Sequence, residues 1–137
     1  PDLTVHGEPK IVPMRAAPNF FIEPRDPDPR GMAVVGADDV EAGTVTDLWV
    51  DRSEPQLRYL EVAVHATGRS VLVPTTMVRV NAKARTVRVQ SILARHFADV
   101  PATAHPERVT LLEEDRIMAY FAAGYVYATE RRRGPLL

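Results

Sequence analysis

Two strand-like runs joined by a charged turn constrain the fold of this chain more than any other feature of its sequence. Residues 44–50 (TVTDLWV) and 58–64 (RYLEVAV) are rich in β-branched and aromatic residues and roughly alternate in polarity. This pattern predicts two half-buried strands. The connection, residues 51–56 (DRSEPQ), is too long for a two-residue hairpin turn, and Pro55 disfavours helix immediately before it. One end of a sheet should therefore display three charged side chains, those of Asp51, Glu54 and Arg58.

Further short strands are expected on both sides of this pair. Apolar runs at 32–35, 69–74, 77–80 and 86–89 are separated by turns that contain glycine, asparagine or aspartate. Five or six short strands at this spacing favour a small closed or nearly closed barrel, because closure removes exposed strand edges. The fold class is therefore expected to be mainly β.

A helix is expected toward the C-terminal end of the chain. Residues 110–113 (TLLE) form a capping-box pattern, in which a threonine and a glutamate three positions later cap the first turn. Ile117 and Phe121 share one face of such a helix. The pattern predicts a helix over about residues 108–124, ended by Gly124. A second, short helix is expected within residues 92–100.

The composition narrows the class of protein. With 137 residues, of which 45% are hydrophobic, the chain can form one globular domain with a core. Its net charge of −1 gives no general attraction to nucleic acid. The absence of cysteine excludes disulfides and thiol catalysis, and no stretch approaches the roughly 20 apolar residues of a membrane-spanning helix. There is no phosphate-binding loop, serine-nucleophile motif or paired-histidine motif, so we do not expect an enzyme.

Residues 1–30 differ in character from the rest of the chain. Seven prolines disfavour helix there and predict an extended segment. The apolar patches at 11–14 (IVPM) and 19–22 (NFFI) favour an arm that docks on this domain or on a partner over a solvated linker. We therefore divide the chain into an extended proline-rich N-terminal arm, residues 1–30, and a domain that comprises residues 31–137 and includes the C-terminal helix.

Four short phrases match a known family in order and spacing: DLWVD at 47–51, RYLEV at 58–62, TLLEED at 110–115 and AAGYVYA at 122–128. Together they resemble the cytoplasmic domain of the H subunit of the purple-bacterial photosynthetic reaction centre. The resemblance covers the chain from about Leu3 to Ala128. Because that domain carries a β-barrel of the PRC type, the resemblance implies a mainly β fold built around a small PRC-type barrel.

The resemblance implies a function inside a larger complex. The H subunit caps the cytoplasmic side of the L and M subunits, stabilises them and conducts protons to the secondary quinone. The domain itself would bind no cofactor; bacteriochlorophyll, bacteriopheophytin, quinones and a non-haem iron belong to the partner subunits. The family carries a transmembrane helix ahead of this domain, and we expect this chain to be the part downstream of it. Antenna proteins are further possible partners, as is anionic lipid near Arg131, Arg132 and Arg133.

The resemblance also implies roles for individual residues around the turn and the helix. Glu54 matches the family's proton-relay acid beneath the secondary quinone, and Arg58 matches the basic residue close to it. Asp51 matches an acid nearby. Glu107 and Glu114 are expected to tune the electrostatics of quinone reduction from a distance.

Proton uptake is expected in the N-terminal arm. His6 matches one histidine of the family's proton-uptake cluster, and its ordinary pKa near 6.5 suits proton exchange. The family has an aspartate two residues before this histidine and a second histidine two residues after it. This chain has Thr4 and Glu8 there; Glu8 can carry a proton and Thr4 cannot.

Other interpretations stay open from the residues alone. The charges of the turn also fit a solvated loop with weak ion pairs, and the acids after Thr110 also fit simple stabilisation of a helix start. Two other classes of protein remain as alternatives. One is a stand-alone PRC-barrel adaptor, like the barrel of ribosome-maturation factors, which binds protein or ribonucleoprotein. The other is a small enzyme with a concave pocket of convergent polar groups.

Overall fold

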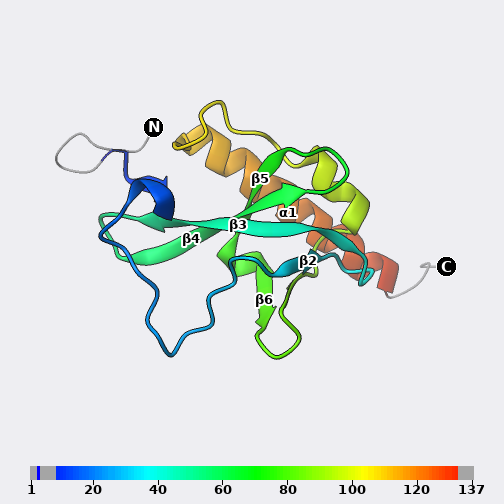
Figure 1. The fold of residues 1–137 in the computed structure, drawn as a ribbon. Helices are drawn as coiled ribbons and strands as arrows, with labels where there is room; N and C mark the ends of the chain where they lie inside the picture. The colour runs from blue at the N-terminus through cyan, green and yellow to red at the C-terminus, as the bar shows by residue number, and fades with distance from the viewer. Residues whose placement is uncertain (1–2, 4–8, 133–137) are drawn as a thin grey trace.

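The computed structural model describes Leu3 and residues 9–132 of the chain, which form one mainly β structure with a C-terminal helix (Figure 1). Seven strands make one sheet with the order β5-β4-β3-β2-β7-β6, and β1 pairs with β3 outside this path. The strands are β1 (Ile11–Pro13), β2 (Ala33–Val35), β3 (Glu41–Asp51), β4 (Gln56–Val64), β5 (Ser70–Pro74), β6 (Val78–Asn81) and β7 (Thr86–Val89). The helix α1 spans Leu111–Arg132, and short 3-10 turns occupy η1 (Met14–Ala16), η2 (Thr75–Met77) and η3 (Ala94–Asp99).

The hairpin of β3 and β4 is the centre of the sheet, which confirms the two strands expected from sequence. The strands pair antiparallel from Gly43 opposite Val64 to Asp51 opposite Gln56, with two shifts of register. Such bulges strengthen the local twist of a strand pair. Both faces of the hairpin are covered, since side chains on opposite faces such as Trp49 and Val50 are almost fully buried.

The mainly β fold class is confirmed, and of the closed or nearly closed barrel expected from sequence, full closure is not found within residues 9–132. Among the described strands no pairing joins β5 to β6, and these two remain the ends of the sheet. Their surroundings explain the open ends. β5 packs against α1, which runs behind β3 in Figure 1. β6 is mostly exposed and contains the charged residue Arg79. An exposed, charged edge strand resists further pairing.

The first apolar patch of the N-terminal arm belongs to the core. Ile11 and Val12 in β1 are buried, and so are Met14 and Ala17 just after it. β1 pairs with the end of β3, with Ile11 opposite Asp51 and Pro13 opposite Trp49. The second patch behaves differently, because Phe20 and Ile22 are only partly buried and Phe21 is exposed. The arm therefore docks at β1 and leaves the sheet again after residue 17.

Helix α1 starts as the capping box predicts but ends later. The hydroxyl of Thr110 accepts the backbone N–H of Glu113 at 3.1 Å, and the Glu113 carboxylate accepts the backbone N–H of Thr110 at 2.8 Å. The expected stop at Gly124 was wrong, because α1 continues to Arg132. A Cβ at Gly124 would lie 2.6 Å from Cγ2 of Ile92 and 2.7 Å from the carbonyl oxygen of Ser91. Glycine is needed there for close packing of the helix, not for its end.

In the part of the chain that the structure describes, no helix combines the length and the hydrophobicity needed to cross a bilayer.

Candidate functional site

Asp51 fixes the shape of the turn between β3 and β4. Its side chain is 1% exposed at the end of β3, and its Oδ1 accepts the backbone N–H groups of Ser53 and Glu54 at 2.8 and 3.1 Å. An aspartate that accepts backbone N–H groups two and three residues later stabilises a turn locally. This explains why the four-residue connection between β3 and β4, which contains a proline, adopts one defined geometry.

Two cations face the other oxygen of Asp51. Nη1 of Arg58, in β4, lies 3.4 Å from Oδ2, and Nζ of Lys10, just before β1, lies 3.8 Å from the same atom. The carboxylate is buried, whereas about a third of each cationic side chain is exposed to solvent. Because one partner is buried, these interactions are screened less by salt than pairs on the open surface.

Arg58 also contacts a second buried carboxylate, which comes from α1. Its Nη2 lies 3.7 Å from Oε1 of Glu114, and the hydroxyl of Tyr59 donates a 2.6 Å hydrogen bond to the same oxygen. Burial, and then the hydrogen bond to Glu114, raise the pKa of the Tyr59 phenol far above its usual range. Tyr59 therefore remains a neutral donor at every physiological pH. We call Asp51, Arg58, Tyr59 and Glu114 the hairpin–helix cluster.

The structure brings together some of the residues expected from sequence and not others. Asp51, Arg58 and Glu114 meet directly. Glu54 lies at the exposed tip of the turn and joins the cluster through its backbone N–H. Glu107 lies elsewhere, with Oε2 3.9 Å from Nε of Arg15. His6 and Glu8 lie outside the described residues.

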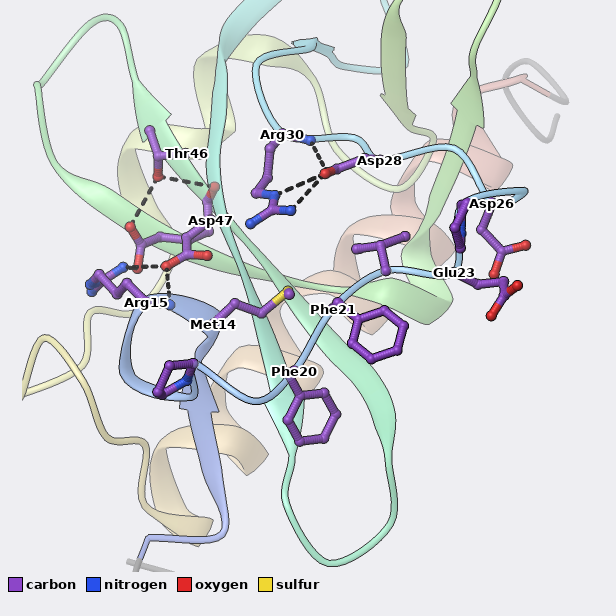
Figure 2. Close-up of a pocket in the computed structure, with 14 residues that line it drawn as sticks. Met14, Arg15, Phe20, Phe21, Glu23, Asp26, Asp28, Arg30, Thr46 and Asp47 are labelled. Atoms are coloured by element: carbon purple, nitrogen blue, oxygen red, sulfur yellow. Dashed lines mark hydrogen bonds and ion pairs between the residues drawn. The ribbon is translucent and has the colours of Figure 1, made fainter.

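A second cluster of charges, which the sequence analysis missed, lies farther from the turn of the hairpin, where Asp47 pairs with Glu61. Nη1 of Arg15 bonds Oδ2 of Asp47 and Oε1 of Glu61, both at 3.0 Å (Figure 2). Glu61 also accepts the indole N–H of Trp49 and the hydroxyl of Thr46, each at 3.0 Å. Both carboxylates are buried, so one guanidinium group balances two buried negative charges. We call Arg15, Asp47 and Glu61 the arginine cluster.

The electrostatics of the arginine cluster favour the charged arginine. Partial burial alone would lower the pKa of Arg15, but the hydrogen bonds and charges of Glu61 and Asp47 outweigh burial and raise it. One feature of the sequence could have indicated this cluster. Asp47 and Glu61 are acids inside two strands that otherwise read as core, and a buried charge in a strand needs a partner.

A cleft of about 850 Å³ lies beside the arginine cluster, beneath the loop of residues 18–30. Figure 2 shows Asp47 toward one end of this cleft and Glu23 and Asp26 toward the other, with Met14 and Phe21 between them. A smaller hollow of about 250 Å³ lies where the same loop meets the hairpin, and Val50, Pro55 and Leu57 help to line it.

The chemistry available at these sites is that of carboxylates held next to cations. No group of three metal-ligating side chains occurs among the described residues, which cover histidines 65, 96 and 105 but not His6. Carboxylates with fixed hydrogen bonds can hold or exchange protons. A permanently charged arginine between two carboxylates favours their negatively charged form. The hairpin–helix cluster fits such a role because exposed Glu54 lies directly beside it.

The open sheet, the central hairpin and the ionic cluster at its end define a small β domain of the barrel-related kind. The sequence profile of the PRC-barrel domain family matches residues 22–95, more than half of the chain. The chain therefore belongs to the PRC-barrel domain family. The matched region contains Asp51, Glu54 and Arg58, whereas Lys10 and Glu114 come from the segments that flank it.

Proposed function

We propose that this PRC-barrel domain is the H-subunit domain of a photosynthetic reaction centre. It would cap the L and M subunits at the cytoplasmic face of the photosynthetic membrane and conduct protons to the secondary quinone. The proposal starts from the resemblance of four sequence phrases to the H subunit, over nearly the whole chain. As an accessory subunit, the domain would have no catalytic activity of its own and would hold neither pigment nor quinone.

One observation supports this proposal more than any other. Residues from three phrases of the resemblance meet in space, because Arg58 in β4 contacts both Asp51 at the end of β3 and Glu114 in α1. The resemblance assigns all three to proton transfer or to its electrostatic control. An electrostatic role in one process requires such proximity, since screening removes most of the interaction beyond about 10 Å at ordinary salt.

The geometry supports a division of labour among these residues. Glu54 is exposed and ionisable, so it can exchange a proton with water or with a partner group. Asp51 holds the backbone of Glu54 in place, and Arg58 limits the negative charge around it. The quinone, in the partner subunits, would take up two electrons and two protons. His6 and Glu8 are proposed to collect protons from water.

The near-infrared absorption spectrum tests this function. The full-length natural protein would be purified from its membranes in mild detergent. Bacteriochlorophyll bands that co-elute with it in a fixed ratio, together with L-like and M-like partners, are the expected result. A colourless protein without such partners would contradict the proposal.

A colourless result would favour the second candidate, a stand-alone PRC-barrel adaptor that binds a protein or ribonucleoprotein. The exposed ring of Phe21 beside a large cleft is the observation in favour of it, since exposed apolar groups next to a cleft often mark a binding surface.

A further inference from the structure

The cleft beneath the loop of residues 18–30 results from a gap in the strand pairing. Along one edge of β3, β2 pairs with residues 41–44 and β1 pairs with residues 49–51. Among the described strands none pairs with residues 46–48 on this edge. The loop that passes over the gap contains prolines 18, 24, 27 and 29, which cannot donate a backbone hydrogen bond to a neighbouring strand. The loop therefore spans the gap without filling it.

The lining of the cleft is strongly acidic. It carries five carboxylates against two guanidinium groups, a formal charge of −3. Asp28 is neutralised by Arg30 at 2.7 Å, but Asp47 and Glu61 share the single charge of Arg15. The remaining two carboxylates are those of Glu23 and Asp26, which are exposed on the loop. Arg25, on the same loop, is not among the residues that line the cleft.

One wall of the cleft is apolar and open to solvent. Phe21 is 77% exposed, more than any other large apolar side chain in residues 9–124. Phe20 and Phe21 also line the smaller hollow next to the hairpin, so the two hollows are neighbours. Together they form a groove with acids toward both ends, Asp47 and Glu61 at one and Glu23 and Asp26 at the other, and with Phe20 and Phe21 between them.

We propose that this groove binds an extended segment of a partner protein that presents arginine or lysine next to apolar side chains. Cationic side chains of the segment would balance the charge that Arg15 leaves uncompensated at Asp47 and Glu61 and the charges of Glu23 and Asp26, and the apolar neighbours would cover Phe21. The negative lining repels nucleic acid and anionic headgroups. A small cation would occupy only one of these acidic ends and leave Phe21 exposed. This surface is distinct from the hairpin–helix cluster and does not depend on the function proposed above.

Site-specific photo-crosslinking tests the proposal directly. p-Benzoylphenylalanine would replace Phe21 in the full-length protein in its natural host, and the cross-linked peptide would be identified by mass spectrometry. The same group at Val40, which is 53% exposed and does not line the groove, is the control. We expect Phe21 to yield one partner segment with arginine or lysine beside the cross-linked residue, and Val40 not to yield it. An acidic or uncharged segment, a second copy of this chain, no cross-link, or the same segment from Val40 would each contradict the proposal.

Charge reversal supplies a second measurement. In the protein with the photo-crosslinker at position 21, Asp26→Lys should lower the yield of the cross-linked segment about tenfold, because it replaces attraction by repulsion. Glu41→Lys makes the same change of charge at a carboxylate that pairs with His65 outside the groove, and the yield should stay the same. An unchanged yield with Asp26→Lys, or an equal loss with both variants, would overturn the proposal.

Discussion

The hydroxyl of Tyr59 donates a 2.6 Å hydrogen bond to Oε1 of Glu114, which ties the central strand β4 to the first turn of α1. Both residues are buried. Arg58, the neighbour of Tyr59, contacts the same carboxylate and also Asp51. The position of the arginine between its two acids therefore depends on where Tyr59 holds Glu114.

Removing the hydroxyl should destabilise the domain measurably. Tyr59→Phe leaves the buried carboxylate of Glu114 with one donor fewer, and a hydrogen bond to a charged group contributes about 1.5–3 kcal/mol to the free energy of unfolding. Tyr120→Phe is the matched control, because the Tyr120 hydroxyl donates at the same 2.6 Å to a neutral acceptor, the carbonyl oxygen of His96. Urea unfolding should show the larger loss for Tyr59→Phe. An equal or smaller loss than in the control would contradict the strength assigned to this bond.

The proton-transfer role predicts a kinetic effect at the tip of the hairpin. Glu54→Gln removes an exchangeable proton but keeps the size of the side chain, and it leaves the backbone N–H that Asp51 accepts. In the intact complex, the second, proton-coupled electron transfer to the secondary quinone should slow on the order of a hundredfold, with assembly unchanged. Flash kinetics measure the rate, and Glu41→Gln is the control at another exposed glutamate. Rates equal to those of the parent protein over a wide pH range would refute the assignment.

Loss of Arg15 should be costly because its partners are buried. Arg15→Met leaves the buried Asp47 and Glu61 without their shared cation; because the Arg15 side chain is itself 42% exposed, we expect a loss below the roughly 3–5 kcal/mol of a fully buried pair but above that of an exposed pair. Arg30→Met removes a similar cation from Asp28, but there both side chains are 40% exposed. An exposed pair contributes about 0–1 kcal/mol. Chemical unfolding measures the free energy of unfolding of both variants. Equal losses would show that burial of the acids does not determine how much each ion pair stabilises the fold.

The capping box gives a prediction for pH. Partial burial would raise the pKa of Glu113, but the hydrogen bonds from Thr110 and Ala104 outweigh it and lower this pKa below the ordinary value of 4.5. A carboxylate with a lowered pKa in the folded state stabilises the fold above its unfolded pKa and loses this contribution as the pH falls. The free energy of unfolding should therefore drop below about pH 4.5, and Glu113→Gln should reduce that drop. An identical pH profile for the two proteins would argue against this account.

The parts of the fold that the sequence predicted are those with a local cause. The alternation of polar and apolar residues over 44–50 and 58–64 predicts the hairpin of β3 and β4. The pair Thr110 and Glu113 predicts where the helix starts. The open ends of the sheet depend on how distant strands pair, and the role of Gly124 depends on its approach to Ser91. Neither leaves a periodic pattern in the sequence.

The candidate sites divide in the same way. Asp51, Glu54 and Arg58 lie in one turn and its flanks, so their proximity was predictable. The contacts of Arg15 with Asp47 and Glu61 join residues 32 and 46 positions apart, and only the three-dimensional structure reveals them. Tyr59 looked like an ordinary strand residue because its partner, Glu114, is 55 positions away.

Because β1 and α1 both pack into the core, the segment that forms the core extends beyond the segment that matches the family. The family match covers residues 22–95, yet Ile11 and Val12 precede it, Ile117 and Phe121 follow it, and all four are buried in the same core. A fragment trimmed to the match would expose the surfaces that these side chains cover. The segment that matches the family is thus shorter than the segment that forms the core, and the flanks that complete the core also bring Lys10 and Glu114 to the ionic cluster.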